Sequence, residues 1–319
     1  MPAKPNFYDQ LQLPVVAAPM FLISGPKLVL ECCKNGIVGT FPALNQRSTE
    51  GFEAWLLEIK AGLGNSKIPY GVNLIVHQSN PRLEADLKIC VKHQVPLIIT
   101  SLGAVSEVVD AVHSYGGLVY HDVINRRHAE KAVAAGVDGL ILVCAGAGGH
   151  AGTLNPMAFT SEIRSFFDKT ILLSGSISNG RDIASALQMG ADLAYMGTRF
   201  INTTESQADE AYQQMIIDSG ANDIVYTAAV SGVNANFLRP SLEAMGITKE
   251  FWDKKAKIDF GKELDAEQAE AKAWKTIWSA GQGVTAINDV LPVNDLVARL
   301  KSEFVEAIQE QSQYLEKFG

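Results

Sequence analysis

One histidine lies inside the glycine-dense segment Gly146–Gly152, directly after an apolar run that begins at Gly139. Glycine admits positive φ angles and lets a backbone approach a ligand closely, so this segment is suited to hold something flat or anionic. The imidazole of His150 would then lie beside that ligand, where it can exchange a proton with it or hydrogen-bond to it. A structural hydrogen-bonding role for His150 is the alternative.

Two other chemistries would use the same residues. The segment fits the G-x-G-x-x-A spacing of a dinucleotide-binding turn, but that motif requires a helix where Thr153–Pro156 favours a turn, so we reject it. Cys144 and His150 have the residue types of a thiol nucleophile and its base. Because Cys144 falls at the end of an apolar strand, a packed and unreactive thiol is favoured. The remaining cysteines, Cys32, Cys33 and Cys90, show no zinc-site spacing, so we expect reduced thiols and no metal.

Composition narrows the class of protein. The 319 residues are 47% hydrophobic and 19% charged, with a formal net charge of −8, which disfavours nucleic acid as a partner. No apolar run approaches the roughly 18 residues of a membrane helix, and the first residues lack the apolar core of a signal peptide. We therefore expect a cytoplasmic protein without membrane contact. A homodimer stays an open alternative.

Eight short apolar segments alternate with helical ones along the first two thirds of the chain. The predicted strands are 13–20, 37–41, 70–75, 96–100, 117–120, 137–143, 170–174 and 193–196. Uniformly apolar strands indicate a parallel sheet that is covered on both faces. Four glycines, Gly36, Gly116, Gly136 and Gly190, stand just before strands, as short turns from helix to strand require.

This alternation predicts a closed (β/α)₈ TIM barrel, with an open doubly wound sheet as the second choice. We assign residues 1–201 and 284–319 to the barrel. Residues 202–283, where the alternation stops, would form an inserted helical domain that covers the substrate, with predicted helices at 205–219, 241–245, 249–255 and 263–280. A last barrel helix is expected from Asp295 to Phe318, because its apolar residues recur at helical spacing.

Two glycine-containing loops follow the seventh and eighth predicted strands. Ser174–Gly180 precedes a helix that opens at Arg181, and Gly197–Phe200 follows the eighth strand. In TIM barrels the site lies at the carboxyl ends of the strands, and these two loops commonly hold a phosphate. Glycine amides and a helix N-terminus would make an anion site without a cation. A phosphate-anchored cofactor that extends across the strand ends, such as flavin mononucleotide (FMN), fits this arrangement.

Seven segments give the chain its resemblance to the nitronate monooxygenase family, formerly called 2-nitropropane dioxygenases. They are Ala17–Met20, Phe41–Arg47, Tyr70–Asn73, Ala147–Gly152, Ser174–Ile177, Met196–Thr198 and Trp278–Gly283. The resemblance implies a metal-free, FMN-dependent enzyme that oxidises alkyl nitronates with O₂ to a carbonyl compound and nitrite. Neutral nitroalkanes would also be substrates if His150 removes the α proton.

The resemblance also implies the residues that hold the cofactor. Ala18, Pro19, Met20 and Asn73 would line the flavin ring, with Gly148 at its edge. The phosphate would contact Gly175, Ser176, Gly197 and Thr198, and a loop with Gln282 and Gly283 would close near the cofactor. His150 is the expected catalytic residue.

One position departs from the family pattern. Some relatives carry a lysine after the histidine of the fifth strand, where this chain has Asp122 after His121, so the charge near the flavin and the choice of substrate or reductant would differ. His121 itself is expected at the functional rim. Similar sequences include NAD(P)H-dependent quinone reductases and a flavin-dependent enoyl-acyl-carrier-protein reductase, which is the alternative activity. A non-catalytic flavin-binding protein is the second alternative.

Overall fold

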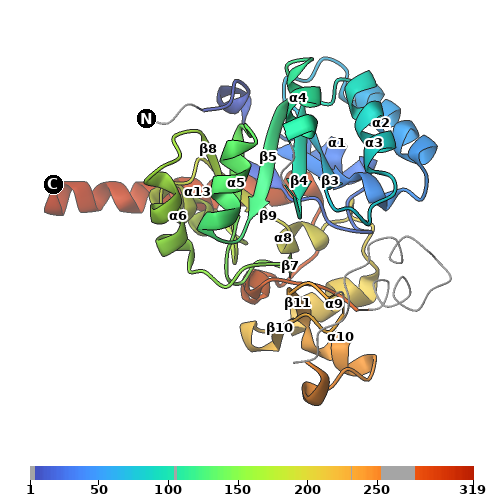
Figure 1. Ribbon diagram of the computed structural model, residues 1–319. Helices are drawn as coiled ribbons and strands as arrows, with labels where there is room; N and C mark the ends of the chain where they lie inside the picture. The colour runs from blue at the N-terminus through green and yellow to red at the C-terminus, as the bar shows by residue number, and fades with distance from the viewer. Residues whose placement is uncertain (1–3, 104–105, 231, 253–276) are drawn as a thin grey trace.

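Eight parallel strands close into a barrel in the computed structural model, which describes residues 4–103, 106–230, 232–252 and 277–319 (Figure 1). The strands are β1 (Val15–Ala17), β2 (Val38–Pro42), β3 (Tyr70–Ile75), β4 (Leu97–Ser101), β5 (Leu118–Val123), β6 (Gly139–Val143), β8 (Thr170–Ser174) and β9 (Leu193–Met196). β9 pairs with β1 and closes the barrel. The predicted (β/α)₈ barrel is confirmed, and each strand overlaps one of the eight predicted segments, with ends that differ by up to three residues.

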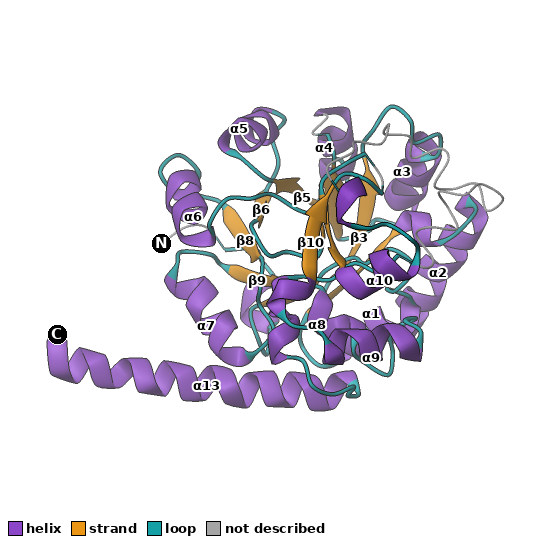
Figure 2. Ribbon diagram, turned by 90° about the horizontal axis from the view of Figure 1, so that it is seen from below, coloured by secondary structure: helices purple, strands orange, loops and turns teal. Residues whose placement is uncertain are grey.

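Helices surround the barrel and cover its outer face (Figure 2). They are α1 (Pro26–Lys34), α2 (Thr49–Leu63), α3 (Leu83–Lys92), α4 (Ser106–His113), α5 (Arg126–Ala134), α6 (Pro156–Arg164), α7 (Gly180–Gln188), the short α8 (Thr198–Ile201) and α13 (Val293–Phe318). Loop residues directly before four of the helices cap them, since the side-chain oxygens of Ser48, Asn125, Asn155 and Asn179 accept backbone N–H bonds at the starts of α2, α5, α6 and α7. The glycines predicted to precede strands all have positive φ, from +79° at Gly36 to +103° at Gly190.

The apolar core has two layers. Inward-facing residues such as Val16, Leu97, Tyr120 and Leu172 fill the barrel, and a larger layer lies between the strands and the helices. Within the described part of the chain, no helix is both long and apolar enough to cross a membrane.

α13 packs along α7 and α1, and its C-terminal end projects beyond the barrel (Figures 1 and 2). The close approach depends on Gly180, because a Cβ there would lie 2.2 Å from the Phe304 nitrogen. Its backbone N–H donates to Glu303 Oε2 at 2.7 Å. The predicted closing helix is present and starts two residues earlier than expected, at Val293.

The segment 202–283 contains strands as well as helices, which the prediction of a helical domain missed. β10 (Ile224–Thr227) pairs with β11 (Ala235–Leu238), and β11 pairs with β7 (Gly149–His150), which comes from the glycine-dense segment after β6. The helices there are α9 (Glu210–Asp218) and α10 (Arg239–Ala244). The predicted helix 263–280 falls mostly outside the described residues, as does the end of 249–255. β10, β11, α9 and α10 lie at one end of the barrel (Figure 1).

Candidate active site

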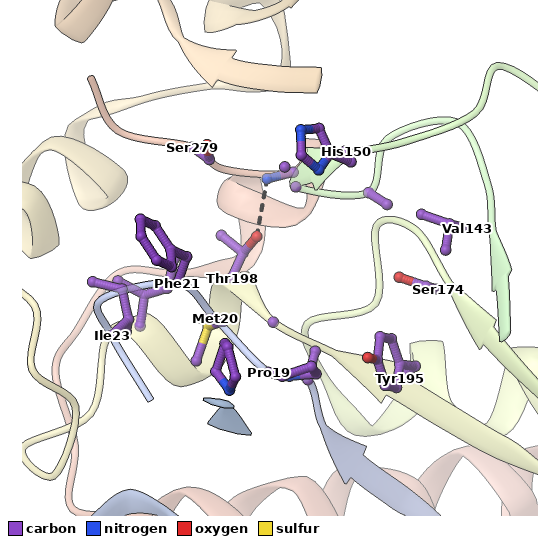
Figure 3. A pocket seen from close by; sticks show the side chains of 18 of the residues that line it. Pro19, Met20, Phe21, Ile23, Val143, His150, Ser174, Tyr195, Thr198 and Ser279 are labelled. Carbon is purple, nitrogen blue, oxygen red and sulfur yellow. Dashed lines mark hydrogen bonds between the residues drawn. The ribbon is translucent and has the colours of Figure 1, made fainter. Parts of the chain in front are cut away.

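A cavity of about 510 Å³ opens at the carboxyl ends of the barrel strands. Strand-end residues form its floor, and part of its wall is formed by residues 207, 209, 212, 277–279, 281 and 283. His150 lies across the cavity from Met20, and Phe21 and Ile23 lie on the Met20 side (Figure 3). The cavity is where the barrel fold places a site.

Most of the predicted site residues come together in this cavity. Its lining includes Ala18, Pro19, Met20, Asn73, Gly148, His150, Gly175, Ser176, Gly197, Thr198 and Gly283. Gln282 is not among the lining residues: its side chain is exposed, and its backbone N–H donates to Gly146 O at 2.9 Å. It fastens the 281–283 segment to the glycine-dense segment.

His150 is positioned by the accessory strands. It pairs with Ala235 of β11, and the Asn236 amide donates to Ala147 O at 2.6 Å, so the chain at the histidine and just before it is held. Burial lowers the pKa of His150 to about 4. The imidazole is therefore neutral at neutral pH and has one nitrogen that donates and one that accepts.

The glycines near His150 serve chain packing more than ligand approach. A Cβ on Gly148 would lie 2.9 Å from the Gly281 nitrogen, and one on Gly146 would lie 2.3 Å from Ser176 Oγ. The Gly281 N–H donates to Thr198 Oγ1 at 2.9 Å, the bond drawn in Figure 3. The glycines at 146 and 148 thus let three chain segments meet behind the cavity wall.

The loop after β8 has the backbone of an anion-binding turn. Gly175 and Ser176 have φ of +135° and +57°, and Ser176 is one of few non-glycine residues with positive φ. The hydroxyl of Ser178 lines the cavity, is buried, and has no hydrogen-bond partner among the described residues. An unpartnered buried donor in such a loop is suited to a phosphate oxygen.

The start of α7 does not contribute to this loop as expected. Asp182 Oδ2 accepts the backbone N–H groups of Ser178 and Asn179, and the Gly180 N–H is bonded to Glu303. These amides already have carboxylate partners, so the predicted helix N-terminus is not available to an anion.

The polar residue of β5 that faces the cavity is Asp122 and not His121. His121 is buried on the outer side of the strand, where its Nδ1 lies 2.7 Å from Thr100 Oγ1, and burial lowers its pKa to about 4. Placing His121 at the functional rim was wrong, since neighbouring strand residues point to opposite faces. Asp122 lines the cavity.

Aromatic residues of the accessory segment form an apolar wall that sequence reasoning did not find. Tyr212 and Trp278 stack at 5.0 Å with ring planes 6° apart, and the Tyr212 hydroxyl donates to Ser279 O. Both rings line the cavity and belong to the apolar cluster that contains Ile23. Their sequence signal was weak, because these aromatics lie outside any strand–helix repeat.

The charged side chains that line the cavity are acidic. Asp122 and Asp209 are the charged residues among the described lining residues, which include neither lysine nor arginine.

Cys144 does not line the cavity; burial raises the pKa of its thiol to about 12, which fits the expected packed thiol and excludes it as a nucleophile.

A TIM barrel with a partly apolar cavity at the carboxyl ends of its strands, and a half-buried histidine in the wall of that cavity, has the architecture of a barrel enzyme. The model of the nitronate monooxygenase family matches residues 82–303, so the chain belongs to this family of oxidoreductases. A nitronate monooxygenase from Paraburkholderia phytofirmans is 26% identical, with 94% of each chain covered.

Two solved structures share the fold. The nitroalkane oxidase from Streptomyces ansochromogenes has a TM-score of 0.81 at 24% identity, covering 95% of this chain and 99% of the other. FabK from Thermotoga maritima has a TM-score of 0.80 at 22% identity, covering 97% of each chain. At these identities, they show the barrel architecture.

Proposed function

We propose that the chain oxidises alkyl nitronates with O₂ in an FMN-dependent reaction that yields a carbonyl compound and nitrite. The observation that carries this proposal is His150, which lies half-buried on the wall of the strand-end cavity and is neutral at neutral pH because its pKa is lowered to about 4. Membership of the nitronate monooxygenase family supports it.

The residues present fit FMN. Gly175, Ser176, Gly197 and Thr198 would hold the phosphate through backbone amides and hydroxyls, and Ser178 offers the unpartnered hydroxyl described above. The ring would lie over Ala18–Met20 and Asn73, with Gly148 at its edge. When bound, FMN would accept the electrons that leave the substrate.

His150 orients the substrate in this proposal. A nitronate is an anion whose negative charge lies on its oxygens, and a neutral imidazole N–H can donate to one of them. The bound anion would in turn raise the pKa of His150 and strengthen this bond. Phe21, Tyr212 and Trp278 would keep water from the alkyl group.

The same pKa argues for nitronates over neutral nitroalkanes. A histidine whose pKa is lowered to about 4 is a weak base, so removal of an α proton from carbon would be slow. We therefore propose that turnover starts from the substrate that has already lost this proton.

The test begins with the purified protein and added FMN. We expect a flavin absorption spectrum to remain after desalting, and nitrite release with oxygen consumption from ethyl nitronate in the absence of NADH. Rapid anaerobic bleaching by NADH or NADPH without nitrite formation would instead assign the chain to the reductase alternative. A protein that retains flavin but does neither would be the non-catalytic binding protein.

A further inference from the structure

Three polar side chains from neighbouring strands form a hydrogen-bonded row on the cavity floor. The Asn73 amide of β3 donates to Ser101 Oγ of β4 at 2.7 Å and to Ile99 O at 3.2 Å. The Ser101 hydroxyl donates to Asp122 Oδ2 of β5 at 2.6 Å. The row therefore ends at a carboxyl group that lines the cavity.

The second oxygen of this carboxyl is not satisfied. Asp122 Oδ1 is buried and has no hydrogen-bond partner among the described residues. No lysine or arginine is found among the described residues that line the cavity, so no cation balances a charge there. A buried carboxylate in this position is unfavourable unless it takes a proton or meets a donor.

Few titratable groups face Asp122. The neighbouring strand ends contribute Asn73, Ser101, Val143 and Ser174 to the cavity, none of which titrates. Tyr195 of β9 is the titratable neighbour, and burial and the charge of Asp122 raise its pKa well above the usual value, so it stays protonated. Burial also raises the pKa of Asp122 itself, to about 6.

The hydrogen-bond row fixes where a proton on Asp122 resides. Because the Asn73 amide donates to Ser101 Oγ, the Ser101 hydroxyl hydrogen is directed at Asp122 Oδ2. Oδ2 is thus an acceptor, and the proton binds Oδ1. The protonated carboxyl becomes a hydrogen-bond donor at an atom that otherwise has no partner.

The barrel places this donor opposite the loops assigned to the phosphate. In the closed order β1-β2-β3-β4-β5-β6-β8-β9, β4 lies across the barrel from β9. A cofactor anchored after β8 and β9 therefore extends toward β3, β4 and β5. The flavin ring has one edge with carbonyl and nitrogen acceptors and one apolar dimethyl edge, and the polar row suits the former.

We propose that Asp122 holds the polar edge of the FMN ring as a neutral carboxylic acid, so that binding of FMN takes up one proton. This rests on the proposed function, because it requires that FMN binds in the cavity. Asp122 is then a positioning residue that makes cofactor affinity depend on pH.

The test measures FMN binding by fluorescence quenching of the apoprotein between pH 5 and 8, for the parent and for Asp122→Asn. An amide keeps an acceptor and a donor in place and cannot ionise. For the parent, the dissociation constant should rise relative to that of Asp122→Asn by about 100-fold over this range, since the protonated fraction falls tenfold per pH unit above the pKa. The ratio of the two constants cancels ionisation of the FMN phosphate, His150 and Asp209.

A second variant checks the direction. The Ser101 hydrogen bond lowers the pKa of Asp122, so Ser101→Ala should raise the pH above which the affinity for FMN falls. Three results would each overturn the inference. The ratio of the parent and Asp122→Asn dissociation constants stays constant with pH, or the fall in FMN affinity begins at lower pH in Ser101→Ala. The third is an Asp122→Asn protein that binds FMN more weakly than the parent at pH 8. If nitronate oxidation is intact in such a case, the proposed function stands; if the parent binds no FMN, both fail.

Discussion

Asn45 fastens the loop between β1 and α1 that carries Met20 and Phe21 into the cavity. Its amide nitrogen donates to Met20 O at 3.0 Å and to Ser24 O at 2.7 Å, and its oxygen accepts the Leu22 N–H at 2.8 Å. Leu22 has a φ of +61°, an unfavourable backbone conformation that these bonds maintain. Asn45→Ala removes all three bonds and releases the loop.

The free energy lost in Asn45→Ala follows from these contacts. Three hydrogen bonds at about 0.5–1.5 kcal/mol each, less roughly 1 kcal/mol of relieved strain, leave a loss of about 0.5–3.5 kcal/mol. If the loop must be ordered to bind FMN, a loss of about 2 kcal/mol weakens binding roughly 30-fold. Asn45→Asp keeps the acceptor but places a carboxylate oxygen against the Met20 and Ser24 carbonyl oxygens, so it should weaken FMN binding at least as much as Asn45→Ala.

FMN titrations and urea unfolding of these proteins are the assay, with the exposed Asn65→Ala as the matched control. We expect a large change in the FMN dissociation constant and a smaller change in global stability, because a surface loop opens locally. An Asn45→Ala protein with the parent's affinity would show that the loop is held by its packing and that the three bonds are dispensable.

Four further results are expected. His150→Ala should retain FMN and lower kcat/KM for ethyl nitronate roughly 10- to 150-fold, which is the worth of a hydrogen bond to a charged group; unchanged kinetics would return His150 to a structural role. The pKa of His150 is lowered to about 4, so the folded state binds fewer protons than the unfolded one. The contribution of His150 to the free energy of unfolding is therefore present above pH 6.5 and is lost as the pH falls to 4. In urea unfolding curves, His150→Gln should reduce the loss of stability between these two pH values by up to about 3 kcal/mol. Thr198→Val should destabilise by about 1–3 kcal/mol by leaving a backbone N–H unpaired, while Thr198→Ser should not. Gly283→Ala would place a Cβ 2.3 Å from Ser178 Oγ and should destabilise the fold by about 1–3 kcal/mol. Adding Ser178→Ala removes the clashing oxygen and should restore part of the lost stability. Equal losses with and without Ser178→Ala would show that the clash is not the cause.

The barrel could be predicted because its evidence is local. Each strand is a short apolar run, and glycines such as Gly36 and Gly136 precede the strands, so each repeat is visible in its own stretch of sequence. The two-residue strand Gly149–His150 could not be predicted in this way. It shows no periodicity, and its partner, Ala235–Leu238, belongs to a segment far along the chain.

Which residues belong to the candidate site could be predicted better than the contacts that these residues make. A uniformly apolar strand hides which face each residue takes, so His121 was placed at the rim that Asp122 occupies. The amides at the start of α7 were expected to be available because Asp182 and Glu303 could not be placed beside them from sequence. Asp182 is close in sequence, but Glu303 is brought there by α13 only in the folded chain.

The pairing of β7 with β11 also sets an order of assembly. Ala147 and its hydrogen-bond partner Asn236 are 89 residues apart, and all eight barrel strands precede β11 in the chain. During synthesis, the strands of the barrel therefore emerge from the ribosome before the residues that hold His150. A chain released before residue 235 would lack the partner of β7, so the histidine acquires its place only after the scaffold around it has been made.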